Sequence, residues 1–419
     1  MGGVAGHLSH LHENLDFTFG EIKSILQNVA SANLEVVEKV DGQNLFFTYR
    51  EGDLMTARNA GDIKSGGMSP ESFASKWKGH PAEDAFMNGF EAIRRAVDRM
   101  TEEDKQAVFQ DGKNYINAEI MYVGNPNIIQ YGANNIVLHN LQSFEGPEPA
   151  VETQGPFKQL VNAVEDIEGE LDAENWKVSG PQIVELRDIS QEGHFEALVS
   201  VLDGLGMSDE ATIGDFVAEQ LRMGEVADLP IPVEKQEGLI NLILSKENAP
   251  SLRDLKAGLS KEVQKQVSSL ATKVNRKKTI ARATLPVETA ISDFAIQVLK
   301  GMQSFFIGDG HDKEVTRMKQ ELQQSITQIQ NAQGTEGMSD MLAKQLEKLG
   351  DIEENVNSTM EGVVFEHPPG SGVLYKLTGS FAMVNQIIGR ARRMDNSPSP
   401  KNEALLREYL RHALPIYVG

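Results

Sequence analysis

Apolar and polar residues alternate in short runs over the first third of the chain, and this pattern predicts β-strands. Leu45–Tyr49 and Leu54–Ala57 flank Glu51-Gly52-Asp53, which predicts a hairpin. Three further runs are predicted to be strands: Leu34–Val37, Tyr115–Tyr122 and Ile136–Leu141. A loop is expected at Glu145–Glu152, which contains two prolines and a glycine.

Apolar residues at helical spacing predict helices between these strands. The spacing covers Phe19–Ala32 and Pro81–Met100. Ser69-Pro70 supplies a cap and a first-turn proline, so a short helix is expected to begin there.

Residues 190–350 consist mostly of amphipathic helix patterns. Val287–Phe306 is predicted to be one helix. Two apolar stripes on either side of Gly334-Thr-Glu-Gly337 predict an antiparallel helical hairpin. The stripes are Val315, Met318, Leu322, Ile326 and Ile329, then Met338, Leu342, Leu346, Leu349 and Ile352. They are either core or a face that binds a protein partner.

Strand patterns return near the end of the chain, at Gly362–Glu366 and Val373–Thr378. A helix at Ala382–Arg393, a linker at Asn396–Pro400 and a helix at Glu403–Leu414 are expected to follow.

This order of elements favours a single α+β domain interrupted by a helical insertion. The expected boundaries are 1–189 for the first part of the domain and 190–350 for the insertion. They are 351–394 for the second part and 395–419 for a helical tail.

Bulk composition excludes several classes of protein. The 419 residues are 40% hydrophobic, without an apolar run long enough to span a membrane and without a secretory signal pattern. The chain has no cysteine, which excludes disulfides, thiolate metal sites and cysteine nucleophiles. A cytoplasmic protein is expected.

The net charge of −21 argues against a generally basic nucleic-acid-binding surface. Two basic clusters nevertheless stand out, Arg276-Lys277-Lys278 and Arg390-Ala-Arg392-Arg393. Each is either solvated surface or part of a local nucleic-acid groove.

The candidate chemistry centres on Glu38-Lys39-Val40-Asp41-Gly42, because neither a P-loop nor a convincing Rossmann glycine pattern is present. A lysine has a reference pKa near 10.4 and is a poor nucleophile at neutral pH. Burial and nearby cations would favour the neutral amine. The competing interpretation is a turn at the end of a strand, since Asp-Gly often marks a hairpin.

This segment resembles the first motif, K-x-D-G, of covalent nucleotidyltransferases in the ATP-dependent polynucleotide ligase superfamily. Glu38 before the lysine and Asn44 after the glycine look most like RNA ligases that seal nicks in duplex RNA. The resemblance implies that Lys39 carries AMP. It also implies that Glu38, Asp41, Gly42 and Asn44 belong to the nucleotide site.

Two more motifs follow in the family's order. Ala57-Arg58-Asn59 resembles serine-arginine-x-glycine but departs from it on both sides of the arginine. It implies that Arg58 holds the ribose or the incoming 5′-phosphate. Glu119, in the apolar run Ile116–Tyr122, resembles the glutamate that bonds the ribose. An acidic residue in such a run is costly unless it is paired. His139 stands where the family stacks an aromatic ring on the purine.

The last two motifs lie far downstream. Met360-Glu361-Gly362 resembles the fourth motif, which implies that Glu361 lies near a divalent metal ion. Leu374–Thr378 resembles the fifth motif, lysine-x-lysine, with Lys376 as the first lysine and Thr378 in place of the second. Lys376 would neutralise the α-phosphate as pyrophosphate leaves.

The resemblance covers about residues 35–145 and 355–385. It implies a nucleotidyltransferase fold of antiparallel sheets with flanking helices, and ATP with Mg²⁺ (or Mn²⁺) as cofactors. The expected activity is RNA ligation through lysyl-AMP, joining 5′-phosphate to 3′-hydroxyl ends and so repairing breaks. Only about 40 residues follow the fifth motif, too few for the OB-fold of most DNA ligases. Arg390, Arg392 and Arg393 are therefore candidates for the nucleic-acid surface.

Two other functions stay open at this point. One is a DNA nick ligase or another nucleotidyltransferase, and the other is a non-catalytic ligase fold that binds or assembles with a protein partner. The opening Gly6–His12, followed by Thr18-Phe19, also looks like an uncharacterised ligase-like family of large tailed phages, for which the compartment would be the host cytoplasm. His7, His10 and His12 are expected to bind a metal, to line the nucleotide or 5′-phosphate pocket, or to be structural.

Overall fold

The protein forms a mixed α+β structure, described by a computed structural model for residues 8–144, 151–152, 154–165, 176–332 and 359–379, with 384 and 387–388. The chain divides into two compact units. The described residues of the first unit fall within 8–9, 34–186 and 299–388, and those of the second fall within 10–33 and 187–298.

Several predictions lie outside the described residues. They are the second helix of the predicted hairpin, most of the helix at Ala382–Arg393, the linker and helix after it, His7, Arg390, Arg392 and Arg393.

The first sheet has five strands in the order β1-β11-β10-β2-β9. Their bounds are Ser9–His10 (β1), Val36–Lys39 (β2), Ile183–Val184 (β9), Gly362–Glu366 (β10) and Leu374–Thr378 (β11). β10 runs antiparallel to both β2 and β11, so that Gly362 lies opposite Lys39 on one side and Thr378 on the other. The strands predicted at Gly362–Glu366 and Val373–Thr378 are confirmed, and the strand predicted at Leu34–Val37 lies two residues later, at Val36–Lys39. These three strands are neighbours in one sheet.

The second sheet is built around the predicted hairpin and follows the path β4-β3-β5-β6-β7, with β8 pairing in parallel with β6. Its bounds are Gln43–Arg50 (β3), Asp53–Ala57 (β4), Asn114–Met121 (β5), Asn134–Ser143 (β6), Val151–Glu152 (β7) and Trp176–Ser179 (β8). Glu51 and Gly52 both have positive φ at the turn, which only glycine adopts without strain. The predicted loop at Glu145–Glu152 was wrong at its end, because Val151 and Glu152 pair with β6.

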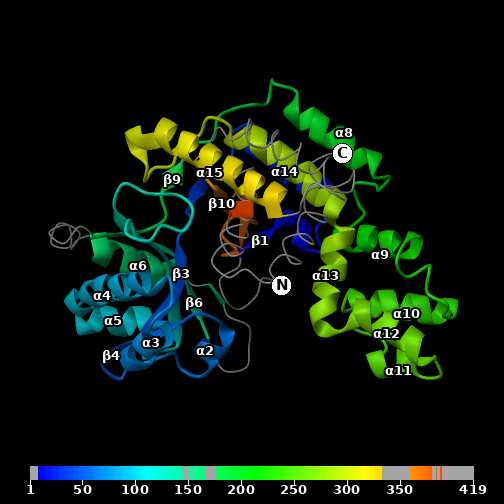
Figure 1. The fold of residues 1–419 in the computed structure, drawn as a ribbon, viewed down its shortest axis with the longest axis horizontal. Helices are drawn as coiled ribbons and strands as arrows, with labels where there is room; N and C mark the ends of the chain where they lie inside the picture. The colour runs from blue at the N-terminus through cyan, green and yellow to red at the C-terminus, as the bar shows by residue number, and fades with distance from the viewer. Residues whose placement is uncertain are drawn as a thin grey trace. The chain divides into compact units, whose positions relative to one another are not determined.

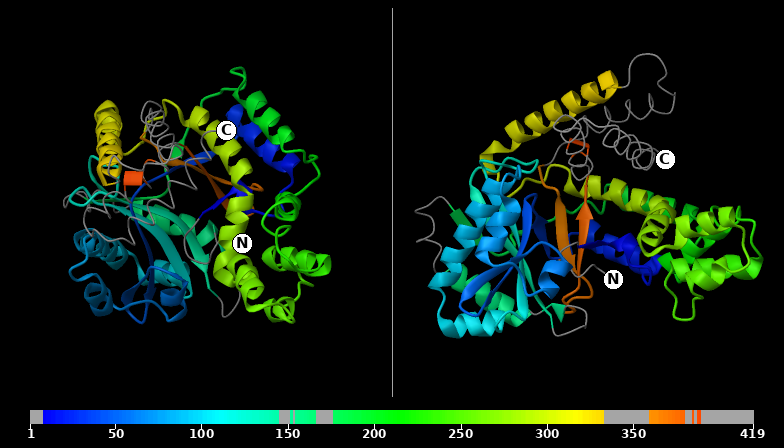
Figure 2. Two further views of the ribbon diagram at one scale, coloured as in Figure 1. Left: turned by 45° about the vertical axis from the view of Figure 1, so that its right-hand side comes forward. Right: turned by 60° about the horizontal axis from the view of Figure 1, so that its bottom comes forward.

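Helices α4, α5 and α6 pack against the second sheet, as Figures 1 and 2 show for the blue-to-green part of the chain. The helices of this region are α2 (Ala60–Lys64), α3 (Pro70–Trp77), α4 (Glu83–Arg99), α5 (Glu102–Phe109) and α6 (Gln154–Glu165). Ser69 caps α3 through the backbone N–H of Ser72, as predicted. Phe86, Phe90 and Ile93 of α4 are almost fully buried against apolar residues of β3, β5 and β6. This apolar layer supports the sheet in which Glu119 and His139 lie.

The later part of the first unit adds the short helix η3 (Gly308–Gly310) and α15 (His311–Ala332). α15 confirms the first predicted stripe, with Met318, Leu322 and Ile326 buried. The helix predicted for Val287–Phe306 was wrong at its end. It stops at Leu299, and Gly301 follows with φ of 78°, a conformation that ends a helix.

The second unit is helical in its described part. It contains η1 (Leu11–Glu13), α1 (Phe19–Ala30), α8 (His194–Gly204), α9 (Ile213–Met223), α10 (Val233–Ile243), α11 (Leu252–Lys256), α12 (Lys261–Ala271), α13 (Lys273–Ala283) and most of α14 (Leu285–Leu299). Helix α1 joins residues 187–298 through ion pairs of Lys23 with Asp203 and Asp209 and a ring contact of Phe19 with Phe216. No helix in the described part of the chain is long and apolar enough to cross a membrane.

Candidate active site

Lys39 is the last residue of β2, and its ammonium group contacts a carboxylate from a distant part of the sequence. Lys39 Nζ donates to Glu361 Oε2 at 2.6 Å, across 322 residues of chain. The two side chains are 17% and 13% exposed, so the ion pair is mostly buried yet reachable from solvent. The pairing of β2 with β10 produces this contact, because Glu361 directly precedes Gly362, the residue opposite Lys39.

Glu119 and His139 connect the loop after Lys39 to the second sheet. Gly42 N donates to Glu119 Oε1 at 2.9 Å, and Glu119 Oε2 lies 3.0 Å from His139 Nε2. Burial raises the pKa of Glu119, but the contact with His139, the charge of Lys39 and the Gly42 amide outweigh it and lower the pKa. Glu119 is therefore held as a carboxylate within the charged surroundings of Lys39.

Gly42 is required by space at this point. A Cβ at Gly42 would lie 2.6 Å from the carbonyl oxygen of Ile120 and 2.8 Å from Cγ of Glu119. Real side chains do not approach a backbone carbonyl so closely. The glycine predicted as part of the nucleotide site thus lets the Lys39 loop pack directly on β5.

Asp41 is held by backbone and side-chain donors from a loop near residue 128. Its Oδ1 accepts from Asn127 Nδ2 at 2.7 Å, and its Oδ2 accepts from the amides of Ile128 and Ile129 at 2.8 and 3.0 Å. The Asp41 amide donates to the Tyr131 hydroxyl at 2.8 Å. These contacts give Asp41 a clear role in fixing the loop that follows Lys39.

The charges around Lys39 set the protonation of the pair. Burial lowers the pKa of Lys39, but the carboxylates of Glu361, Glu119 and Asp41 outweigh burial, and the net shift is upward. The sequence had suggested the opposite direction, because the closeness of three carboxylates was not visible in it. Burial raises the pKa of Glu361 to about 7, although the ammonium of Lys39 opposes that rise.

Glu38 differs from its neighbour because adjacent residues of a strand point to opposite faces. Its side chain is buried and accepts from the amide of Phe305 at 2.8 Å. Burial raises the pKa of Glu38 to about 7, against the hydrogen bonds from Ser304 and Phe305. The structure thus gives Glu38 a contact with the segment after α14, on the face of β2 away from Lys39.

Asn44 and Arg58 both lie near Glu119. Asn44 is directly opposite Glu119 in the β3–β5 register, and its Nδ2 donates to Asn117 Oδ1 at 2.5 Å. Paired residues of neighbouring strands share a face of the sheet, so Asn44 lies on the same face as Glu119.

The guanidinium of Arg58 lies over two aromatic rings, 4.9 Å from the centre of Phe86 and 5.6 Å from that of Trp77. Burial lowers its pKa, while the charges of Glu119 and Asp62 oppose this. Its Nη1 is buried and has no hydrogen-bond partner among the described residues. Such a donor is costly to leave unsatisfied, which makes Arg58 a good candidate for binding an anion.

Lys376 lies on the same face of the first sheet as Lys39. It is opposite Val364, which is in turn opposite Val37, two residues before Lys39. Thr378 is in the same cross-strand row as Lys39, separated from it by Gly362. The two predicted lysines therefore come from neighbouring parts of one sheet surface.

The structure adds site residues that the sequence did not indicate. They are Asn127 and Tyr131, which hold Asp41, Asn117, which holds Asn44, and Ser304 and Phe305, which hold Glu38. Most of these contacts join residues more than 70 positions apart in loops or strands without a local motif, so no signal in the sequence could have found them.

The predicted metal ligand Glu361 has one oxygen on Lys39. Within the described ranges, no group of three or more histidine, aspartate or glutamate side chains has the arrangement of a metal site. A single carboxylate nevertheless fits Mg²⁺, which is usually held by one or two carboxylates together with substrate phosphates. Glu361 fits that donor set.

His10 and His12 contact each other and a carboxylate of the second unit. Their rings stack with centres 5.1 Å apart, and His12 Nε2 lies 3.7 Å from Glu288 Oε2. His12 is 4% exposed. Stacking and burial favour the structural interpretation of these two histidines.

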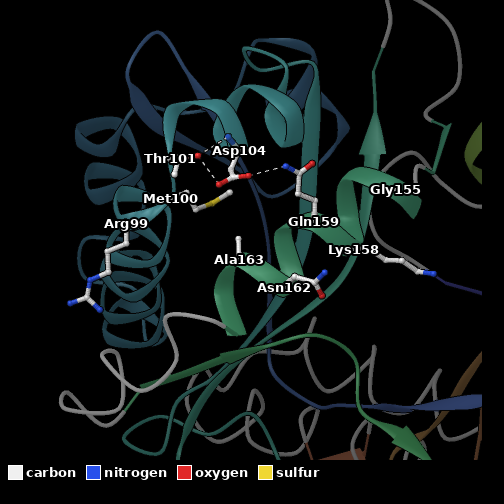
Figure 3. Close-up of a pocket in the computed structure, with 9 residues that line it drawn as sticks. All are labelled: Arg99, Met100, Thr101, Asp104, Gly155, Lys158, Gln159, Asn162 and Ala163. Carbon is white, nitrogen blue, oxygen red and sulfur yellow. Dashed lines mark hydrogen bonds between the residues drawn. The ribbon is translucent and has the colours of Figure 1, made fainter.

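A separate hollow of about 570 Å³ lies between the end of α4, the start of α5 and α6. Figure 3 shows its nine lining residues, none of which is a predicted site residue. Asp104, its only carboxylate, accepts from Thr101 and from Gln159 Nε2. The lining contains no second carboxylate and no histidine, so we assign no chemistry to this hollow.

Comparison with known proteins adds little. No family model matches the chain, and no curated protein matches it. One solved structure, described as "Archaeal ATP-dependent RNA ligase - form 1", is similar at 12% identity over 71% of this chain and 67% of that chain, with a TM-score of 0.21. A TM-score this low carries no argument about fold or function.

Proposed function

We propose that the protein is an ATP-dependent polynucleotide ligase that acts through a lysyl-AMP intermediate on Lys39, with RNA as the acceptor. The observation that carries the proposal is the approach of three distant segments. Glu361 from β10 contacts Lys39, and Glu119 from β5 contacts the Lys39 loop at Gly42. Chance proximity does not explain why these are the residues that resemble successive motifs of one enzyme superfamily.

The proposed first step is attack of the neutral Lys39 amine on the α-phosphorus of ATP. A bond forms between Nζ and the α-phosphorus, the bond to the bridging oxygen breaks as pyrophosphate leaves with the electron pair, and Nζ releases one proton to solvent. Glu119 and Arg58 orient the nucleotide, and Lys376 balances the charge of the α-phosphate. Mg²⁺ bound through Glu361 and the phosphates would neutralise negative charge beside Lys39 and so favour its neutral amine.

In the later steps AMP passes from Lys39 to a 5′-phosphate end, and a 3′-hydroxyl attacks that end and releases AMP. The choice of RNA rests on the resemblance of Glu38 and Asn44 to duplex-RNA ligases. Arg390, Arg392 and Arg393 remain the proposed contacts to nucleic acid beyond the described residues. The domain boundaries at 189, 350 and 394 and the link to large tailed phages also remain predictions.

Self-adenylylation tests the proposal directly. Incubation with α-labelled ATP and Mg²⁺, followed by a denaturing gel, should give a labelled band that Lys39→Ala abolishes. Lys64→Ala, which changes an exposed lysine on α2, is the matched control and should keep the full label. Absence of label on the wild-type protein with ATP and with GTP would sink the catalytic proposal and favour a non-catalytic ligase fold.

The acceptor is identified by nicked duplexes of RNA, DNA and RNA–DNA hybrid. Sealing of the RNA nick is expected to be fastest, and Arg392→Ala/Arg393→Ala should lose sealing but keep the label on Lys39. Sealing of DNA alone would replace the RNA assignment with a DNA nick ligase.

A further inference from the structure

Positive charge in this acidic protein is concentrated in helices α10 to α13 of the second unit. Residues 233–284 contain 11 lysines and arginines against five aspartates and glutamates, a net charge of +6. The remaining 367 residues carry a net charge of −27. These four helices pack on one another (Figure 1). Leu239, Ile243, Leu255 and Val267 on α10, α11 and α12 are buried.

Five lysines on α12 and α13 are exposed, and we refer to them as the lysine platform. They are Lys261, Lys265, Lys273, Lys277 and Lys278. None of the five forms an ion pair or side-chain hydrogen bond with another described residue. On α13, Lys273, Lys277 and Lys278 fall within an arc of about 140° at 3.6 residues per turn, and the buried Thr279 lies on the opposite side.

The two arginines of α13, unlike its lysines, form hydrogen bonds within the protein. Arg276 Nε donates to the carbonyl of Ala271 at 2.9 Å, and Arg282 forms two hydrogen bonds of 2.9 Å with Glu225. These arginines therefore stabilise the fold, whereas the lysines beside them face solvent. The run Arg276-Lys277-Lys278 divides into one structural residue and two exposed charges.

The lysines of α13 do not help the helix itself. Lys273 is its first residue, where the helix dipole disfavours a positive charge. Lys273 and Lys277 are four residues apart on one face, and like charges at that spacing repel. α13 contains no acidic residue that would offset this repulsion. An unfavourable local arrangement of exposed cations indicates an external anion.

We propose that the lysine platform binds the phosphate backbone of duplex nucleic acid. Residues 233–284 contain no Phe, Tyr or Trp, so the segment has neither the stacking rings used to bind single strands nor the aromatic anchors of membrane interfaces. Lysine is a point charge suited to phosphate without base readout. Binding is therefore independent of sequence, and its assignment to the ligase acceptor rests on the proposed function.

Salt dependence of binding tests this surface apart from catalysis. The full chain is titrated against a fluorescent 24-base-pair RNA duplex at several salt concentrations, without ATP. Each phosphate contact contributes about 0.9 to the slope of log K against log salt, so Lys273→Gln/Lys277→Gln/Lys278→Gln should flatten the slope by about 2.7. Between 50 and 200 mM salt the wild type should then lose about 40-fold more affinity than the variant.

The control variant is Lys64→Gln/Lys78→Gln/Lys313→Gln, which removes three exposed lysines of the other unit and changes the net charge equally. It should keep the wild-type slope, as should Lys273→Arg/Lys277→Arg/Lys278→Arg, which keeps the three charges. The proposal is overturned if the platform variant keeps the wild-type slope, if both variants flatten it equally, or if the wild type binds phosphatidylserine vesicles and not the duplex. Self-adenylylation is measured on every variant, so that failure of the ligase proposal is seen separately from failure of the platform.

Discussion

At the scale of the residue, the neighbours Glu38 and Lys39 are both mostly buried but differ in charge state. Burial penalises the charged form of both side chains. Lys39 overcomes the penalty because the carboxylates of Glu361, Glu119 and Asp41 surround it, and its pKa rises. Glu38 receives only hydrogen bonds, and its pKa rises to about 7. The same strand therefore carries a stabilised ammonium on one face and a carboxyl that resists ionisation on the other.

Glu38 predicts a pH dependence of stability. Its pKa is about 7 in the folded protein and 4.5 in the unfolded chain, so the unfolded chain releases this proton first. Protonated Glu38 therefore contributes fully to the free energy of unfolding below pH 4.5, and this contribution is lost as the pH rises to about 7. The loss amounts to about 3 kcal/mol at 1.36 kcal/mol per pKa unit. Glu38→Gln cannot ionise, so its free energy of unfolding should fall less than that of the wild type over this range.

Urea unfolding at several pH values measures the difference. Glu35→Gln is the matched control, because it makes the same chemical change at an exposed position four residues from Lys39, and it should follow the wild-type curve. If the free energies of unfolding of Glu38→Gln and the wild type fall in parallel from pH 4.5 to pH 7.5, ionisation of Glu38 does not cause the pH dependence of stability.

At the scale of the element, two glycines allow strands and loops to approach where the site is built. Gly42 places the Lys39 loop against β5. Gly362 lies in the row between Lys39 and Thr378, where a Cβ would collide with the carbonyl of Leu377. At both positions the atom nearest to an added Cβ would be a backbone carbonyl oxygen, which cannot move aside as a flexible side chain does.

Gly42→Ala should therefore destabilise the protein and reduce labelling of Lys39. Overpacking against a fixed backbone costs about 1 to 3 kcal/mol, and relief of the clash would move the Lys39 loop. Thermal unfolding and the labelling assay measure the two effects. Gly155→Ala is the control, since a Cβ there would have nothing within 4 Å. An unchanged melting temperature for Gly42→Ala would contradict the close contact between Gly42 and the carbonyl of Ile120.

Much of the sheet around the site could be predicted from the sequence. The hairpin of β3 and β4, the strands β5 and β6 and the final pair β10 and β11 are each largely apolar runs of five or more residues, and each was predicted within about two residues. The two-residue strands Ser9–His10, Val151–Glu152 and Ile183–Val184 were missed because a run so short has no periodicity. β8, Trp176–Ser179, was missed as well.

The candidate site was predicted as a set of residues and not as a geometry. Motif order indicated that Lys39, Glu119 and Glu361 belong together. The direction of the pKa shift on Lys39 depends on the spacing of carboxylates from three strands and loops, which no local pattern encodes. The burial of Glu38 against Phe305 depends equally on a contact across 267 residues.

At the scale of the whole molecule, two units with separate cores predict two thermal transitions. ATP at 100 times its dissociation constant should stabilise the unit that contains Lys39 by about 2.7 kcal/mol, which raises its transition by roughly 5 to 10 °C. The other transition should not move. Differential scanning calorimetry of the full chain measures both.

Gly42→Ala identifies the transition of the Lys39 unit, because it should lower that transition alone. A single transition in the wild type, or an equal shift of both by ATP, would contradict independent stability of the two units.

The pairing of β2 with β10 also determines when the site can exist during translation. Lys39 is synthesised 322 residues before Glu361, an interval of roughly 15 to 65 s at about 5 to 20 residues per second. Throughout that time the edge of β2 that will face β10 has no partner, and an unpaired edge is prone to wrong pairing. The contact between Lys39 and Glu361 can therefore form only after Glu361 has left the ribosome.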